Sequence, residues 1–190
     1  MQTIALIALG YIFGSLSSAI IISRALGLPD PRTEGSGNPG ATNMARTGGK
    51  KAAAMTLFGD LTKGLVPVLI AKGLGAELEA QLLVALAALL GHLYPVFFRF
   101  QGGKGVATAL GVLFGLQWQI ALAWLVTWLA VFTWKKVSSL SALTATALVP
   151  LYIWIFSGSL SFVVFGIVIT ILIYWRHRTN IEELLAGTED

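Results

Sequence analysis

The sequence predicts an all-α integral membrane protein with about seven transmembrane helices, its N-terminus outside and its C-terminus in the cytoplasm. Hydrophobic residues form 56% of the 190 residues and charged residues 12%, whereas a soluble domain carries roughly 25% charged residues. Several apolar runs approach the ~20 residues that cross a bilayer. A small soluble protein needs more polar surface than this. A soluble enzyme, a nucleic-acid-binding module and a disordered chain are therefore excluded, and one transmembrane domain over 1–190 is expected.

Seven apolar segments are candidate crossings, and they lie at 2–24, 52–73, 78–98, 105–117, 118–134, 139–157 and 159–175. Only Met1 and Gln2 precede the first segment. Because it lacks the basic region of a signal peptide, we interpret it as a retained helix. The segment 105–117 is too short to cross comfortably, so whether it fully spans is left open.

The positions of the cations set the predicted orientation. With seven crossings, 11 of the 13 Lys and Arg residues fall on one side, namely Arg24, Arg32, Arg46, Lys50, Lys51, Arg99, Lys104, Lys135, Lys136, Arg176 and Arg178. The positive-inside rule makes this side cytoplasmic. Within the second segment, Asp60 and Lys63 are three residues apart and share a helix face. A buried ion pair is favoured over a substrate pathway for these two residues.

The first long connection is rich in glycine and single polar residues from Gly35 to Asn43, with Arg46 close behind. Successive backbone N–H groups in such a turn form an anion-binding nest, and an arginine adds a bidentate donor. The glycine spacing also matches a dinucleotide fingerprint, but no strand precedes it, so that fold is rejected. The alternative is a polar turn that leads into the next helix.

A second glycine-rich stretch, Gly102-Gly103-Lys104-Gly105, comes directly before the fourth apolar segment. A helix N-terminus beside a lysine is suited to a phosphate group. The stretch is not a Walker A loop, because Phe98 stands where the first glycine belongs and Gly105 replaces the Ser or Thr. The alternative is a glycine-hinged turn with a snorkelling lysine.

Two further connections carry polar groups on the predicted cytoplasmic side. Lys135 to Ser141 is typical of a basic anchor followed by a helix N-cap. His177 lies between Arg176 and Arg178, where it is a proton carrier, an anion ligand or a headgroup contact. The chain has no cysteine and two histidines, so we predict no thiolate nucleophile and no Cys-ligated or His-rich metal site. No metal and no other cofactor are expected.

Three motifs together resemble the bacterial acyl-phosphate:glycerol-3-phosphate acyltransferases (PlsY type), and they are residues 35–43, 102–108 and 177–181. The resemblance implies an inner-membrane, multi-pass enzyme with its active face in the cytoplasm. It implies transfer of an acyl group from acyl phosphate to the 1-hydroxyl of glycerol 3-phosphate, giving lysophosphatidic acid and phosphate. Membrane lipid is the surrounding partner, nucleic acid is not a partner, and a monomer is expected.

The resemblance also assigns site residues. The catalytic set is Ser36, Arg46, Lys104, Ser141 and His177. The substrate-binding set is Gly37, Asn38, Gly40, Thr42, Asn43, Gly102, Gly103, Gly105, Thr108 and Asn180. Ser138 and Ser139 stay alternatives to Ser141, and the general base is either His177 or a substrate phosphate. Glu189 matches a structural acid, whereas Glu182-Glu183 departs from the cation expected there.

Two functions of other classes compete with the enzyme. A small transporter or channel for phosphorylated or anionic solutes would account for the polar loops and for the charges within the second segment. Transporters often carry internal repeats, and the two halves of this chain show no convincing repeat. A membrane scaffold without activity would not account for the glycine-rich basic loops.

Overall fold

The computed structural model describes residues 1–189, and within that range every regular element is helical. The chain divides into two compact units, one from Met1 to Leu116 and one from Gln117 onward. The predicted all-α class is confirmed for the described residues. A single domain over 1–190 stays a prediction.

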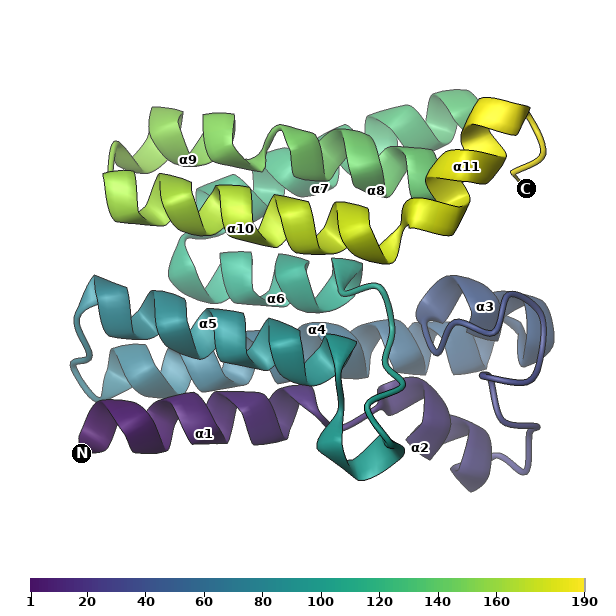
Figure 1. The fold of residues 1–190 in the computed structure, drawn as a ribbon, viewed down its shortest axis with the longest axis horizontal. Helices are drawn as coiled ribbons and strands as arrows, with labels where there is room; N and C mark the ends of the chain where they lie inside the picture. The colour runs from purple at the N-terminus through teal and green to yellow at the C-terminus, as the bar shows by residue number, and fades with distance from the viewer. Residues whose placement is uncertain (190) are drawn as a thin grey trace. The chain divides into compact units, whose positions relative to one another are not determined.

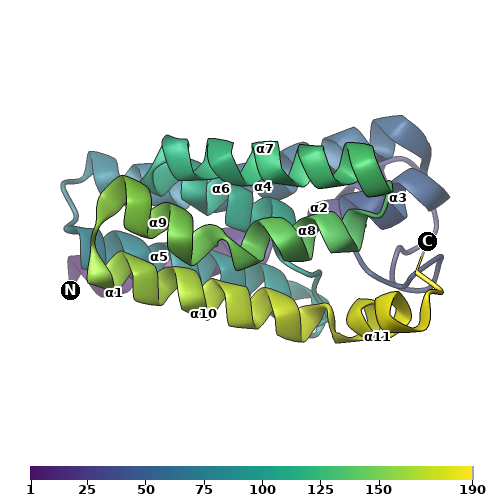
Figure 2. The same cartoon turned by 90° about the horizontal axis from the view of Figure 1, so that it is seen from above.

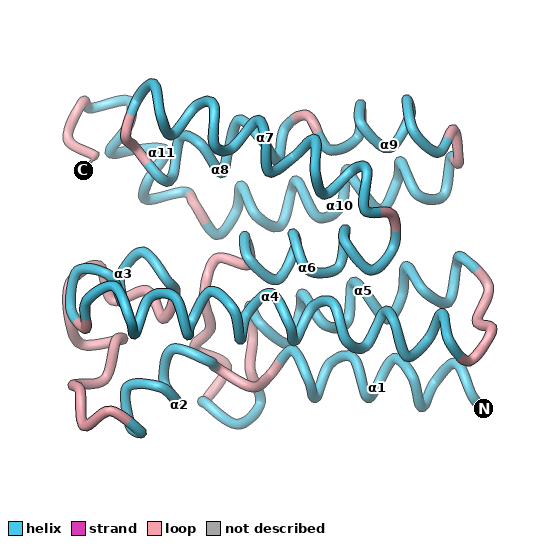
Figure 3. The backbone as a smooth tube through the Cα atoms, turned by 180° about the vertical axis from the view of Figure 1, so that it is seen from behind, coloured by secondary structure: helices cyan, strands magenta, loops and turns pink. Residues whose placement is uncertain are grey.

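The first unit contains six α-helices and one short 3₁₀ helix. They are α1 (Gln2–Gly14), α2 (Ser18–Ala25), α3 (Ala41–Thr47), α4 (Gly49–Gly73), α5 (Leu78–Leu93), η1 (Val96–Phe98) and α6 (Val106–Leu116). Helix α4 contacts all five other α-helices, and α1 packs along α5 (Figure 1). The loops before α3 and before α6 lie at the end of the unit away from the N-terminus (Figure 3).

Glycines bring α4 and α6 into backbone contact. A Cβ on Gly64 would overlap the carbonyl oxygen of Thr108, and one on Gly111 would overlap that of Leu61. Small residues at helix contacts allow the close approach on which packing within a membrane depends. The short α6 is thus held directly against the central α4, and the loop before α6 is held with it.

The first apolar segment is not one helix, as the range 2–24 predicts, but two helices bent by 44°. Ser17 adopts an extended conformation between them. The break takes the carbonyl of Leu16 out of the helical ladder, and this oxygen accepts a hydrogen bond of 2.8 Å from the Lys63 ammonium. The helix therefore breaks where a buried cation needs an acceptor.

The same ammonium lies 2.8 Å from the carboxylate of Asp60, and both side chains are buried. This confirms the predicted ion pair. His92 joins it, with Nδ1 3.7 Å from the carboxylate. A buried charge is costly without a partner, and Lys63 supplies it here, while His92 of α5 lies close to the same carboxylate of α4.

The second unit contains α7 (Trp118–Lys135), α8 (Ser138–Ala147), α9 (Val149–Ser157), α10 (Leu160–Arg176) and α11 (Arg178–Ala186). Helix α7 packs against α8 and α9, and α10 packs against the same two helices (Figure 2). The Trp124 indole donates to the Thr146 hydroxyl across 3.3 Å. The predicted N-cap side chain before α8 is wrong, because Val137 occupies that position and no side chain caps the helix.

By length and composition, three helical segments of the described residues are able to cross a membrane, and five are if each bent pair counts as one. The three are Gly49–Gly73, Leu78–Phe98 and Ser138–Ser157, and the pairs are α1 with α2 and α10 with α11. Helix α6 has only 11 residues, or about 16 Å of helix against a hydrocarbon core of about 30 Å. Seven crossings and their orientation stay predictions.

Candidate active site

Asn43 organises the first glycine-rich loop. Its side chain is 1% exposed, and its Oδ1 accepts a 3.0 Å hydrogen bond from the backbone N–H of Ser36. Its Nδ2 donates to the carbonyls of Pro31 and Glu34, each at 2.9 Å. Three of the hydrogen bonds that an amide can make are thus used within the loop. The structure places Asn43 as a brace for the loop.

The polar groups that Asn43 holds in place face outward. Ser36 is exposed between Gly35 and Gly37, whose φ angles of +56° and +69° suit glycine. Thr42 and Arg46 are also exposed, and as residues four apart on α3 they share a helix face. Exposed hydroxyls and a guanidinium on one braced loop form a set of donors for a phosphate group.

The second glycine-rich loop lies against the end of α5. A Cβ on Gly102 would overlap the backbone carbonyl of His92, and one on Gly103 would overlap the Nε2 atom of the same residue. The N–H of Gly103 donates to the His92 carbonyl across 3.3 Å. Gly105 has φ +87°, and its carbonyl accepts the first hydrogen bond of α6, from Ala109 at 2.7 Å. The prediction that this loop opens a helix is confirmed.

Lys104 is half-buried at the tip of this loop, and Thr108 is fully buried one turn into α6. The Thr108 hydroxyl donates to the backbone carbonyl of Asp60 across 3.0 Å. Thr108 therefore fastens α6 to α4, which makes it a support for the loop. Lys104 is the one cation that the loop itself carries.

The first unit brings the two glycine-rich loops together. A Cβ on Gly103 would lie 3.2 Å from the carbonyl oxygen of Pro39. The segments that precede the two loops are also in contact, since Nη1 of Arg32 donates at 3.4 Å to the Gln101 side chain and to the Phe98 carbonyl. Its guanidinium also binds Asp30 at 2.6 Å, and this contact holds the pKa of the Asp30 carboxyl below its ordinary value.

The third motif lies in the second unit, at the bend between α10 and α11. His177 is 3% exposed, and its Nδ1 lies 2.8 Å from the carbonyl of Ile173. Because a carbonyl only accepts, Nδ1 must carry the proton of this hydrogen bond. In the neutral ring the basic lone pair is then on Nε2. This is the tautomer in which Nε2 is able to take a proton.

Asn180 lies three residues after His177 and binds the C-terminal segment. Its Nδ2 donates to the two carboxylate oxygens of Glu189, at 2.7 and 3.0 Å. Glu189 therefore has a structural contact, in line with the structural role that the resemblance implied. The hydrogen bonds fix the orientation of the Asn180 amide on α11.

The serines at the start of α8 differ in their contacts. The Ser141 hydroxyl donates to the carbonyl of Val137 across 2.7 Å, and Ser141 is fully buried. Ser139 is 7% exposed, and its hydroxyl has no hydrogen-bond partner among the described residues. Each hydroxyl keeps lone pairs for a donor, so the choice among Ser138, Ser139 and Ser141 stays open.

Sequence reasoning did not assign His92 to the site, although the structure places it beneath Gly102 and Gly103 and beside Asp60. A signal was present, since Gly91-His92 ends a strongly apolar run. No group of three His, Cys, Asp or Glu side chains suited to a metal is found among residues 1–189.

Comparison with known proteins decides the family. A family model described as glycerol-3-phosphate acyltransferase matches residues 4–187. The chain belongs to the glycerol-3-phosphate acyltransferase family. A glycerol-3-phosphate acyltransferase of Thioalkalivibrio sulfidiphilus is 57% identical over 97% of this chain and 91% of its own. One of Methylococcus capsulatus is 54% identical over 97% of this chain and 93% of its own.

Solved acyltransferase structures show the same fold. Two crystal structures of PlsY (YgiH), an integral membrane glycerol 3-phosphate acyltransferase, cover all of this chain and 95% of theirs. The glycerol 3-phosphate form has a TM-score of 0.95 at 42% identity, and the lysophosphatidic acid form 0.92 at 41%. This acyltransferase chain is accordingly a multi-pass membrane protein, and the resemblance drawn from its three motifs is confirmed.

Proposed function

We propose that this chain transfers a fatty acyl group from acyl phosphate to the 1-hydroxyl of glycerol 3-phosphate, producing lysophosphatidic acid and inorganic phosphate. The observation that carries the proposal is its likeness over its whole length to an acyltransferase crystallised in glycerol 3-phosphate and lysophosphatidic acid forms. The region matched by the family contains all three motifs. The residues of the three motifs act in one reaction, and both units belong to one catalytic domain over 1–190.

The two glycine-rich loops bind the phosphate groups. Lys104 and the backbone of Gly102, Gly103 and Gly105 hold the phosphate of glycerol 3-phosphate, because a cation beside a helix N-terminus stabilises a dianion. Ser36 and Arg46, with the loop residues Gly37, Asn38, Gly40 and Thr42, hold the acyl phosphate and the charge that develops on it. Asn43 and Thr108 position these groups through their hydrogen bonds to the backbone.

The reaction needs no covalent enzyme intermediate. The 1-hydroxyl oxygen attacks the acyl carbonyl, the bond from the acyl carbon to the phosphate oxygen breaks, and phosphate leaves with the electron pair. The hydroxyl proton goes to Nε2 of His177 or to a substrate phosphate oxygen. The tautomer fixed by the Ile173 carbonyl supports His177 as the acceptor. Ser141 and Asn180 supply polar contacts to the substrates.

The proposed enzyme is an integral membrane protein with its motifs at one face of the membrane. It crosses the bacterial inner membrane seven times as a monomer, with the N-terminus outside and the C-terminus and the motifs on the cytoplasmic side. The acyl chain stays among the helices, and the polar ends of both substrates meet at the interface. No metal, other cofactor or nucleic acid takes part.

A reconstitution assay tests the function. Purified full-length protein in lipid mesophase is given acyl phosphate and glycerol 3-phosphate, and lysophosphatidic acid and phosphate are quantified together. The two products are expected in equal amounts. Absence of product across lipid compositions and pH would overturn the proposal. Uptake of labelled glycerol 3-phosphate into vesicles without acylation would instead support the transporter.

A further inference from the structure

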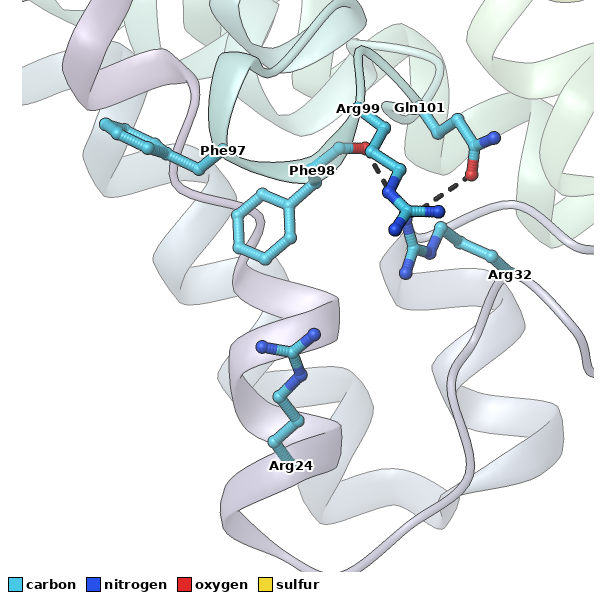
Figure 4. A pocket seen from close by; sticks show the side chains of 6 residues that line it. All are labelled: Arg24, Arg32, Phe97, Phe98, Arg99 and Gln101. Atoms are coloured by element: carbon cyan, nitrogen blue, oxygen red, sulfur yellow. Dashed lines mark hydrogen bonds between the residues drawn. The ribbon is translucent and has the colours of Figure 1, made fainter.

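A cavity of about 320 Å³ lies in the first unit, outside the set of residues assigned to the reaction. It is lined by three arginines, two phenylalanines and a glutamine, namely Arg24, Arg32, Arg99, Phe97, Phe98 and Gln101 (Figure 4). Its volume falls at the lower end of the range for small-molecule sites, about 300–1,000 Å³. We propose that this cavity binds the phosphate group of an anionic, single-chain amphiphile from the surrounding lipid.

The charge of the cavity favours an anionic ligand. Arg32 is neutralised by Asp30, with Nη2 2.6 Å from the carboxylate. Among residues 1–189, no carboxylate lies within ion-pairing distance of Arg24 or Arg99. The guanidinium of Arg24 lies 6.0 Å from the centre of the Phe98 ring, a cation–π contact that leaves its charge in place. The cavity therefore carries two cations in excess, and an anion with several oxygens satisfies both at once.

A tight backbone turn presents these donors to the cavity. The chain turns back on itself after η1, with Arg99 and Phe100 both in the left-handed region at φ +56° and +60°. The N–H groups of Phe98 and Phe100 both donate to the carbonyl of Pro95, at 3.1 and 3.0 Å. Side chains rarely adopt this conformation, and such strain concentrates at ligand sites. Here the turn places Arg99 and Gln101 on the cavity.

An exposed apolar surface lies beside the cavity. Phe97 is 57% exposed, Phe100 56% and Val96 43%, all on or next to η1. Exposed phenylalanine and aliphatic side chains next to cations are typical of segments that lie in the membrane interface. A free phosphate would use the arginines alone, whereas an amphiphile also covers the phenylalanines with its chain. The combination favours a phosphate headgroup with an acyl or alkyl chain.

Photolabelling of the full-length protein tests the site. The probe is an alkyl phosphate with a diazirine in its chain, and labelled peptides are located by mass spectrometry. Label is expected on the segment 96–101 of the wild-type protein. The double variant Arg24→Gln/Arg99→Gln is expected to carry at least about tenfold less label, because two charged hydrogen-bonding groups are lost. Arg24→Lys/Arg99→Lys keeps both charges and retains a substantial part of the label. Lys51→Gln, which removes an exposed cation elsewhere in the unit, leaves it unchanged.

Two further probes identify the ligand. The matching diazirine alcohol has no phosphate and is expected to label segment 96–101 weakly. Equal labelling by the alcohol, or by Arg24→Gln/Arg99→Gln with an unchanged melting temperature, overturns the proposal. Inorganic phosphate and unlabelled alkyl phosphate are compared as competitors of the label. If they compete equally well, the ligand is soluble phosphate and the assignment of an amphiphile is wrong. The readout is a position in the chain, so it does not depend on whether the acyltransferase assay succeeds.

Discussion

The backbone of Gly103 lies so close to the imidazole of His92 that a single added methyl group would overlap Nε2. The imidazole is 5% exposed and its Nδ1 lies 3.7 Å from Asp60. The glycine-rich loop of the second motif therefore packs on a buried ring that lies next to a buried carboxylate. This relationship connects the ion pair within α4 to the loop that carries Lys104.

Gly103→Ala is expected to lower both stability and turnover. The added Cβ has to displace either the buried ring or the loop, and overpacking of this kind costs about 1–3 kcal/mol. The melting temperature of the detergent-solubilised protein measures the first effect. Gly73→Ala is the matched control, because nothing lies within 4 Å of a Cβ at the end of α4. Equal melting temperatures for the two variants would contradict the tight contact.

Lys104→Ala is expected to raise the KM for glycerol 3-phosphate by at least about tenfold, since a charge-assisted contact to phosphate is lost. The KM for acyl phosphate should change much less. Steady-state kinetics with each substrate varied in turn make the comparison, and Lys51→Ala controls for the loss of one cation. A selective rise in the KM for acyl phosphate would instead assign acyl phosphate to the loop of Lys104 and glycerol 3-phosphate to the first loop.

His177→Asn tests the base and keeps the local structure. The asparagine amide replaces the Nδ1–H that donates to Ile173, but it removes the basic nitrogen at Nε2. If His177 is the base, turnover falls and the acidic limb of the pH–rate profile disappears. His177→Gln should flatten the same limb. A profile of unchanged shape would assign the proton to a substrate phosphate.

Asn43→Ala is expected to destabilise the first unit in the absence of any substrate. It leaves one N–H and two carbonyls of the loop without their partner, at a cost of about 1–3 kcal/mol for a buried group. Asn43→Asp keeps the acceptor for Ser36 but turns an oxygen toward the carbonyls of Pro31 and Glu34, so it should also lower the melting temperature. If both variants have the melting temperature of the wild type, Asn43 does not brace the loop, and only its substrate-binding role is left.

Removal of the Arg32 guanidinium is expected to raise the pKa of Asp30 toward its ordinary value. Because the pKa is depressed in the folded protein, the pair stabilises above the unfolded pKa of about 3.9 and this contribution is lost as pH falls through the folded pKa. The pair is partly exposed, so its contribution is at most about 1 kcal/mol. Carbon-13 NMR titration of the Asp30 carboxyl in Arg32→Gln measures the shift. No shift relative to Lys51→Gln would rule out the pairing in solution.

The sequence by itself determined the membrane character, the helical fold class and the three motifs. Low charge and long apolar runs depend on composition alone, and the motifs are contiguous, so both are visible without a fold. The ion pair of Asp60 and Lys63 was also predictable, because residues three apart share a helix face whatever the rest of the chain does.

Tertiary structure decided what each polar residue contacts. The break between α1 and α2 follows from the need of Lys63 for the Leu16 carbonyl, 47 positions away in sequence. The hydrogen bond from Thr108 to the Asp60 carbonyl and the packing of Gly103 against His92 likewise join separate segments of the chain. Such contacts join helices distant in sequence, where local periodicity carries no information. Tertiary packing therefore decides which motif residues are buried and support the loops and which are exposed. It also decides which arginines line the cavity.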